Sequence, residues 1–278
     1  MSIPFHRVLA AAAALAWFVP AFCAAEDVPF VTTPDKVTLA MLEAAKVNRR
    51  DYVIDLGSGD GRIVIVAAKR FGARGLGVEI VPHLVKLSRE NAARAGVEDR
   101  ARFVEQDLFK TDLGHATVVT LYLLPDVNLE LRPKLLELKP GTRIVSHDWD
   151  MGEWQPDKTL TLDVPDKKVG IEKKSRVHLW IVPARIDGEW CGTGSSRDMR
   201  LTIRQQFQHV QADLAGASSK ESFIGQLEGS ELRGARLGDA PIGLKHSRKR
   251  LVLTRGGGLL NPSARASVFV RRKGASCR

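Results

Sequence analysis

The sequence has little that would build a metal centre. It contains three cysteines and seven histidines, all scattered, and no histidine lies at a zinc-binding interval from a cysteine. We therefore predict no metal site. The few cysteines do not define a redox compartment. Loss of an N-terminal segment holding Cys23 would leave Cys191 and Cys277, which could pair in an oxidising space, but the sequence does not require it.

The chain also lacks an apolar run long enough to cross a bilayer comfortably at its N-terminus. Residues 8–19 are apolar but short for that purpose. His6 and Arg7 precede this run, and residues 23–25 offer small side chains for cleavage. Residues 1–25 are therefore predicted to be a signal peptide or an N-terminal anchor. The protein is expected to be exported or membrane-associated, or to stay at the cytoplasmic face of the membrane if the segment is uncleaved.

The first two thirds of the chain carry almost no net charge. The net charge is +10, and residues 185–278 hold 17 Lys and Arg against 8 Asp and Glu. This excess could serve an anionic membrane or an acidic partner, although a solvated basic face or tail is the simpler explanation. We predict no specific nucleic-acid binding. The sequence changes character near Ala184, where regular alternation of predicted strands and helices ends, and this divides the chain into a first domain, residues 26–184, and a basic domain, residues 185–278.

The stretch from Tyr52 to Gly61 organises the first domain. Residues 52–56 form a short apolar run that predicts a buried parallel strand, and residues 62–70 show helical periodicity. Three glycines, Gly57, Gly59 and Gly61, stand between them. Glycines let the backbone approach a ligand closely, and the following helix presents free N–H groups to it. Strand, glycine turn and helix together predict a nucleotide-binding turn.

The spacing of the glycines selects the nucleotide. A dinucleotide-binding turn would place a third glycine at position 62, which is Arg62. The pattern here is Gly-x-Gly-x-Gly, preceded by Asp55, which is typical of class I methyltransferases that bind S-adenosyl-L-methionine (SAM). The residues of this turn that we predict to bind SAM are Asp55, Gly57, Ser58, Gly59 and Gly61.

Two further acidic residues follow predicted strands in the order that such a site requires. Residues 75–80 read as a second strand that carries Glu79 near its end, placed to accept hydrogen bonds from both ribose hydroxyls. Residues 102–108 read as a third strand that ends in Asp107 and Leu108, where an acid can accept from the adenine amino group. We assign Glu79, Asp107 and Leu108 to the SAM site.

The remaining pattern predicts an α/β fold, a doubly wound, Rossmann-like sheet of seven strands. Repeated alternation of strands and helices implies a mostly parallel sheet with helices on both faces. Further strands are expected at residues 117–124, 143–148, 159–164 and 177–182, and helices at about 34–47, 82–95 and 128–138. Thr33 is the expected N-cap of the first helix. Pro133 is expected near the start of the last helix, or to kink it.

The basic C-terminal domain has a different texture. Short strands are predicted at residues 201–210, 223–227, 251–254 and 267–270, separated by turns rich in Gly and Ser. This pattern favours a small antiparallel β-meander or a partial barrel. About thirty residues at the end of the chain are expected to lack order.

Several stretches resemble one family. Residues 29–34, 55–64, 121–125 and 145–148, with Glu79 and the Gln106-Asp107-Leu108 run, are similar to the seven-strand protein-lysine methyltransferases of mitochondria and their bacterial relatives. Eukaryotic members modify lysines of the c-ring protein of ATP synthase and of the adenine nucleotide translocase. The resemblance covers about residues 28–155 and leaves the basic domain unexplained. It implies a protein substrate with a target lysine.

A lysine substrate needs a group that takes its proton. The amine has a pKa near ~10.4 in water and must become neutral before it attacks the methyl group. Tyr122, Asp148 and the backbone turn at Leu124 and Pro125 are the candidates, and we predict Tyr122 and Asp148 as catalytic. His147 and Asp148 could equally be structural residues at a strand end. No Asn/Asp-Pro-Pro-Tyr motif follows the fourth strand, which argues against an adenine-amino methyltransferase.

Two other functions stay open at this point. One is methylation of a small molecule, for which no sequence feature argues directly. The other is a non-catalytic SAM-binding or ligand-binding envelope protein whose β-rich domain does the work. The predicted signal peptide favours this last alternative, because SAM is made in the cytoplasm.

Overall fold

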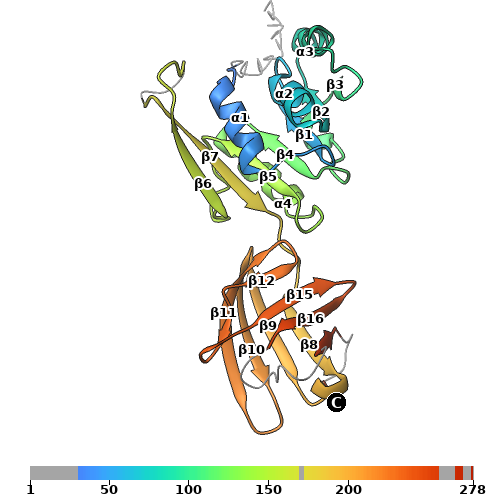
Figure 1. The fold of residues 1–278 in the computed structure, drawn as a ribbon, viewed down its shortest axis with the longest axis vertical. Coiled ribbons are helices and arrows are strands. Elements are labelled where there is room, and N and C mark those ends of the chain that lie inside the picture. Colours follow the sequence, from blue (N-terminus) through green and yellow to red (C-terminus); the bar gives the residue numbers. More distant parts are fainter. Residues whose placement is uncertain (1–30, 169–171, 257–266, 272–276, 278) are drawn as a thin grey trace, which may run out of the picture. The chain divides into compact units, whose positions relative to one another are not determined.

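The computed structural model describes residues 31–168, 172–256, 267–271 and 277 (Figure 1). The predicted signal peptide or anchor at residues 1–25 therefore lies outside the described residues. Within the described part of the chain, none of the helices combines the length and the apolar character needed to cross a bilayer.

Seven strands form one mixed sheet with the order β3-β2-β1-β4-β5-β7-β6. The first five run parallel, whereas β7 is antiparallel to both β5 and β6. Their bounds are Tyr52–Leu56 (β1), Arg74–Glu79 (β2), Ala101–Glu105 (β3), Val118–Leu121 (β4), Arg143–His147 (β5), Lys158–Asp163 (β6) and Lys174–Ile181 (β7). The predicted Rossmann-like seven-strand sheet is confirmed.

Helices cover both faces of this sheet (Figure 1). They are α1 (Asp35–Ala44), α2 (Arg62–Phe71), α3 (Pro82–Ala95) and α4 (Pro125–Leu135). Successive strand residues point to opposite faces, so Val53 packs with α1 and α2, and Ile54 packs with α4. This double burial explains why successive residues of β1, β4 and β5 are buried, without the alternation of a strand that has one face in solvent.

Two details of the helices differ from expectation. Pro133 does not lie near the start of α4, because the helix begins at Pro125, with Pro133 in its last turn. There the proline leaves the carbonyl four residues earlier without its usual N–H partner, and the helix ends two residues later. Thr33 does not cap α1 either: Pro34 is the N-cap and no side chain caps the helix. The Thr33 hydroxyl instead contacts His147, at 3.4 Å from Nδ1.

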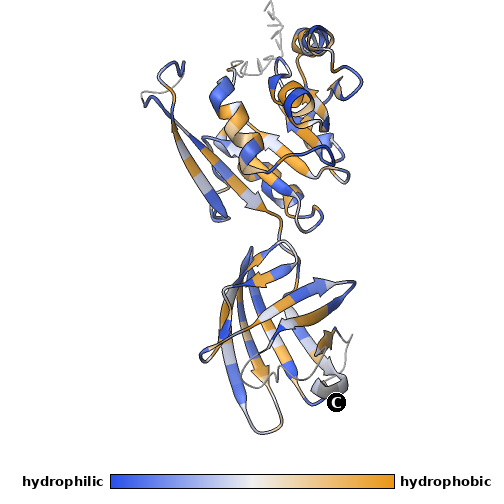
Figure 2. Ribbon diagram, viewed as in Figure 1, coloured by the Kyte–Doolittle hydropathy of each residue, from blue (hydrophilic) through white to orange (hydrophobic). Residues whose placement is uncertain are grey.

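The C-terminal region forms a closed barrel of eight strands, more complete than the predicted meander or partial barrel. In spatial order they are β10 (His209–Ala215), β11 (Lys220–Glu228), β12 (Glu231–Arg233), β15 (Gly243–Ser247), β16 (Arg250–Arg255), β17 (Val268–Val270), β8 (Gly188–Thr193) and β9 (Arg200–Gln206). A separate pair is formed by β13 (Arg236–Leu237) and β14 (Ala240–Pro241). Apolar and hydrophilic residues alternate along the barrel strands (Figure 2), which places one set in a common core with Trp190, Phe223 and Phe269.

Two predictions for this region were wrong. Residues 201–210 are not one strand, because the chain turns at Phe207, where φ is 52°, and divides into β9 and β10. The last thirty residues contain β16 and β17, close to the strands predicted at residues 251–254 and 267–270, and β17 closes the barrel by pairing with β8. Residues 257–266, 272–276 and 278, which also belong to the predicted unordered tail, lie outside the described residues.

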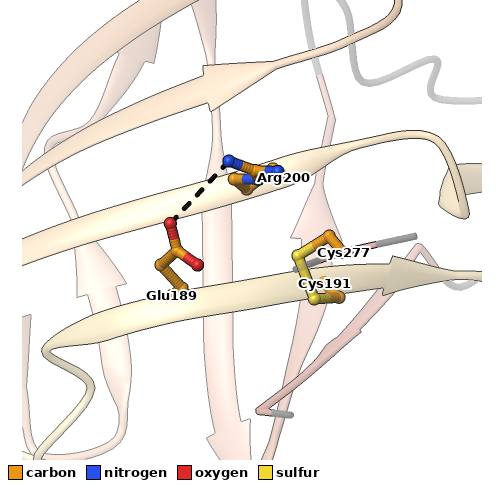
Figure 3. Close-up of a disulfide and its surroundings, with 4 residues drawn as sticks. All are labelled: Glu189, Cys191, Arg200 and Cys277. Carbon is orange, nitrogen blue, oxygen red and sulfur yellow. Dashed lines mark ion pairs between the residues drawn. A yellow bond between two sulfur atoms is a disulfide. The ribbon is translucent and has the colours of Figure 1, made fainter. Parts of the chain in front are cut away.

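A disulfide joins the barrel to the end of the chain. Cys191 on β8 bonds to Cys277 across 86 residues of sequence (Figure 3). On the same strand, Glu189 forms an ion pair of 3.9 Å with Arg200 of β9 (Figure 3). The pairing of these two cysteines, which the sequence left open, is therefore part of the folded structure.

Candidate functional site

The glycine turn has the backbone conformation that its sequence predicts. Gly57, Gly59 and Gly61 have φ angles of 72°, 52° and 81°, a region that other residues rarely adopt. Gly61 is the N-cap of α2, so the turn delivers the chain directly into the helix. A Cβ on Gly57 would lie 2.7 Å from the Leu123 side chain, which shows that the turn abuts the chain just after β4. The turn is thus a tight cradle at the carboxyl ends of β1 and β4.

Glu79 is the central acid of this cradle. Its carboxylate is buried and accepts three backbone N–H groups, from Gly59 (2.9 Å), Ile80 (2.9 Å) and Val81 (3.0 Å). The side chain therefore ties the glycine turn to the end of β2 and to the start of α3. Carboxylate oxygens offer about four acceptor positions, so the group retains capacity for a ribose hydroxyl. Its placement beside Gly59 is consistent with a bond to one ribose hydroxyl, whereas the prediction named both.

Asp55 lies beneath the turn on β1. Its carboxylate is buried and accepts a hydrogen bond of 2.7 Å from the Thr120 hydroxyl. Burial raises the pKa of Asp55 to about 7, and the nearby Asp60 and Glu79 charges add to this rise. Ser58 is also buried, and its hydroxyl has no hydrogen-bond partner within the described structure. Asp55 and Ser58 thus belong to the inner layer of the cradle.

Asp107 and Leu108 do not lie within a strand as predicted. β3 ends at Glu105, and the chain then turns into a short 3-10 helix, Leu108–Lys110, with Asp107 as its N-cap. The strand stops because the Asp107 carboxylate accepts the Phe109 N–H (2.9 Å), which favours the helical turn. The Gln106 N–H still bonds to the Glu79 carbonyl (2.9 Å), so Asp107 remains at the same sheet edge as Glu79.

Three residues form a compact group at the neighbouring strand ends, which we term the strand-end cluster: Tyr122, His147 and Asp148. The Tyr122 and His147 rings lie 4.0 Å apart between centroids, and His147 Nε2 lies 3.4 Å from the Asp148 carboxylate. Asp148 adopts a left-handed conformation with φ 64° and accepts the Arg176 N–H (2.9 Å). Such a conformation is uncommon for a residue other than glycine. Here the Asp148 side chain is held by its contacts with His147 and with the Arg176 N–H.

Sequence reasoning missed three partners of this cluster. Ser175 on β7 lies 3.0 Å from His147 Nε2, and Thr33 lies near the other ring nitrogen. Lys167, in the connection between β6 and β7, forms an ion pair of 2.7 Å with Asp148. No local pattern marks these contacts, because each joins segments distant in sequence. Only the antiparallel pairing of β7 with β5 could have suggested Ser175.

The strand-end cluster places two uncharged rings, those of Tyr122 and His147, beside the Asp148 carboxylate. Burial lowers the pKa of His147 to about 4, with Asp148 opposing and Lys167 reinforcing the shift. Burial, and then the Asp148 charge, raise the pKa of Tyr122 above its ordinary value. Both rings are therefore uncharged near pH 7. Tyr122 is not a base under these conditions, which leaves Asp148 as the candidate proton acceptor of the predicted pair.

The segment before α1 is attached to both parts of the site. Arg62, the residue that replaces a third glycine, donates from Nη1 to the Thr33 carbonyl (2.8 Å) and pairs with Asp60 through Nη2 (2.7 Å). Thr33 in turn contacts His147. Residues 31–34 thus lie between the glycine turn and the strand-end cluster. Residues 29 and 30 of the family-like segment lie outside the described residues.

These residues fit SAM. The glycine cradle, the buried hydroxyl of Ser58 without a partner and the acids Glu79 and Asp107 share one sheet edge, which could hold a nucleoside with a charged sulfonium. The described residues contain no group of His, Cys, Asp and Glu that could hold a metal ion. The SAM-contacting and catalytic roles of individual residues remain predictions that this arrangement supports.

Known proteins share the first domain. The profile of the ANTKMT methyltransferase domain matches residues 55–158. A protein-lysine N-methyltransferase of Saccharolobus islandicus is 47% identical over 138 residues, which are 49% of this chain and 86% of that protein. The adenine nucleotide translocase lysine N-methyltransferase of Mus musculus is 38% identical over 132 residues. That match covers 47% of this chain and 57% of the mouse protein.

A solved structure extends the comparison. A protein of Salinibacter ruber, described as an RNA methyltransferase in complex with S-adenosyl-L-homocysteine, is 53% identical. The match covers 56% of this chain and 96% of that protein, with a TM-score of 0.52. The chain therefore belongs to the ANTKMT methyltransferase domain family, and it is a SAM-dependent methyltransferase of the seven-strand class.

Proposed function

We propose that this methyltransferase transfers the methyl group of SAM to lysine side chains of a protein. Relatives from Saccharolobus islandicus and Mus musculus carry that activity in their names. The observation that carries the proposal is the ion pair of 2.7 Å between Asp148 and the Lys167 amine. The strand-end cluster thus offers a carboxylate at hydrogen-bonding distance from a lysine ammonium.

For methyl transfer to lysine, the protein mainly has to position SAM and the amine and to remove one proton from the ammonium group. SAM supplies an activated methyl group on a sulfonium, which a neutral amine displaces in line. The Asp148 carboxylate accepts the ammonium proton, while the uncharged His147 ring lies 3.4 Å from that carboxylate. The Tyr122 ring packs against His147 and excludes water from that side. Glu79 and the glycine turn hold the nucleoside end of the cofactor.

RNA is the second candidate substrate, since the Salinibacter ruber relative is described as an RNA methyltransferase. The barrel region and its tail carry a charge of +9, from 17 Lys and Arg against 8 Asp and Glu, which would also suit a polyanion. Against this, we expect the acceptor to bind beside the Asp148 carboxylate, which favours a cationic acceptor such as lysine over a neutral base. The family membership does not favour the non-catalytic alternative.

One experiment separates these substrates. The full chain is incubated with methyl-labelled SAM and a cell extract that is then divided into protein, RNA and small-molecule fractions. We expect the label in protein, as Nε-methyllysine after hydrolysis, and we expect Gly59→Val to abolish it. Label confined to RNA or to small molecules would contradict the proposal. Asp148→Asn should keep SAM binding and lose most of the transfer.

The finer partner and the location are also part of this proposal. The barrel bears a groove of about 720 Å³ whose lining includes Arg204, His209 and Arg233. We propose that this basic region contacts an acidic partner or an anionic membrane. The disulfide between Cys191 and Cys277 supports an oxidising compartment, in line with export. Cosedimentation with anionic and neutral vesicles at low and high salt tests the membrane contact, and thiol alkylation of the protein taken from cells tests the compartment.

A further inference from the structure

Lys167 is placed like a substrate. It lies in the connection between β6 and β7, and its side chain is only 13% exposed although the chain turns there at the surface. Its amine pairs with the Asp148 carboxylate at 2.7 Å and donates to the Lys174 carbonyl at 2.6 Å. The next residue, Lys168, is exposed. Two adjacent lysines thus differ sharply in their surroundings.

The two acceptors around this amine are the kind that lysine deprotonation requires. A carboxylate and a carbonyl can hold two of the three ammonium hydrogens, and transfer of one to the carboxylate frees the nitrogen lone pair. The carboxylate belongs to the strand-end cluster, whose Tyr122 immediately precedes Leu123 in the chain. Leu123 packs directly against Gly57 of the SAM cradle. The amine therefore lies at the sheet edge where the methyl donor binds.

An ion pair with a purely structural role would be expected where the fold depends on it for stability. Holding a flexible lysine in one conformation costs side-chain entropy, and a largely buried ion pair must also offset the desolvation of both charges. The β6–β7 pair is already held by six consecutive registered residue pairs, from Lys158 with Leu179 to Asp163 with Lys174. The hairpin thus needs no additional clamp from Lys167 to keep its register. The stability of the hairpin therefore does not explain why the Lys167 amine is held in this position.

We propose that Lys167 is a methylation site of the chain itself, modified within the same molecule; this rests on the proposed lysine N-methylation. The neutral Nζ attacks the methyl carbon of SAM, so the N–C bond forms as the S–C bond breaks. The sulfonium leaves as the neutral thioether of S-adenosyl-L-homocysteine. The proton released from the ammonium passes to the Asp148 carboxylate and then to water. The product is Nε-methyllysine at position 167.

The test is direct. The purified full chain is incubated with SAM that carries a deuterated methyl group, cleaved after glutamate, and analysed by tandem mass spectrometry of the peptide from residue 154 to residue 172. We expect the deuterated methyl at Lys167 and not at Lys168. The modified fraction after a fixed time should not change over about a tenfold dilution of the protein. Gly59→Val should abolish the label, and Lys168→Arg should leave it intact.

Three results would overturn the proposal. One is an unmodified Lys167 in a preparation that methylates an added protein, which would leave the proposed function standing. A second is equal labelling of Lys167 and Lys168, which would indicate unselective transfer. A third is labelling that rises with protein concentration, which would indicate transfer between molecules. If a preparation that binds SAM methylates no protein at all, the proposed function itself fails, and this inference falls with it.

Discussion

The His147 ring packs against the Tyr122 ring at 4.0 Å between centroids, and this contact joins the ends of the neighbouring strands β4 and β5. It fixes the imidazole beside the Asp148 carboxylate without a charge on either ring. A single carboxylate thus remains as the charged group of the strand-end cluster. The site is consequently suited to a cation that must lose a proton.

The glycine turn should tolerate no side chain at its centre. Gly59→Val should abolish SAM binding, because a β-branched residue at φ 52° is strained and the turn must approach the cofactor closely. Gly96→Val is the matched control, since Gly96 also has a positive φ (66°) but lies at the end of α3 in open space. It should cost stability alone. Calorimetry that shows the two variants binding SAM equally well would contradict this placement of the site.

Glu79 should matter more than an ordinary acid of the first domain. A buried charge-assisted contact typically contributes about 1.5–3 kcal/mol, so Glu79→Ala should weaken SAM binding at least about tenfold. Its loss also frees three backbone N–H groups, including that of Gly59. Glu90→Ala, in the exposed part of α3, serves as the control. Equal SAM affinities of the two variants in a titration would mean that Glu79 does not contribute to the cofactor site.

Asp55 should make stability depend on pH. The native state keeps its proton up to about pH 7, whereas the unfolded state releases it near 3.8. Between these values the native state binds more protons, so the free energy of unfolding should fall as the pH rises from about 4 to 7. Asp55→Asn should remove this loss, up to about 4 kcal/mol for a shift of about three pKa units. Thermal denaturation without SAM measures it.

The control for this pH effect is Glu130→Gln, which changes an exposed acid on α4. It should leave the pH dependence of the wild type unchanged. If Asp55→Asn and the wild type lose stability in parallel between pH 4 and 7, the carboxyl of Asp55 is charged throughout that range and the assignment is wrong.

The disulfide should stabilise the barrel and leave the cofactor site alone. A cross-link over 86 residues restricts the unfolded chain, and losses of about 2–4 kcal/mol are typical when one is removed. We expect Cys191→Ser with Cys277→Ser to lower the melting temperature while SAM affinity stays the same. Reduction of the wild type should reproduce the effect. An unchanged melting temperature in both experiments would show that the bond adds nothing to the fold.

The sequence predicts the elements that are locally encoded and misses those set by distant contacts. β1 and α3 begin and end at the predicted residues, because a largely apolar run, a leading proline and a terminal glycine mark their limits. The glycine turn and Glu79 follow from spacing alone. The barrel is different: β8 closes it by pairing with β17, about 75 residues later. Short-range periodicity carries no signal for such a contact.

The same distinction applies to the site. Tyr122 and Asp148 could be predicted because strand ends meet at one edge of the sheet. The role of His147 between them, and the Lys167 partner of Asp148, depend on packing between segments that are not neighbours in sequence. Asp107 illustrates the reverse case. Its side chain caps a short helix, so the local capping signal was stronger than the strand pattern that we favoured.

The most direct test of the account is the effect of Asp148→Asn on lysine methylation of a protein substrate. The variant keeps the shape of the side chain but removes the base, so kcat should fall by about 10²–10⁴ while the SAM dissociation constant stays within about twofold of the wild type. Lys167→Gln breaks the same ion pair but keeps the carboxylate, and it should retain kcat for the added substrate. A kcat unchanged by Asp148→Asn would contradict the assignment of Asp148 as the group that takes the lysine proton.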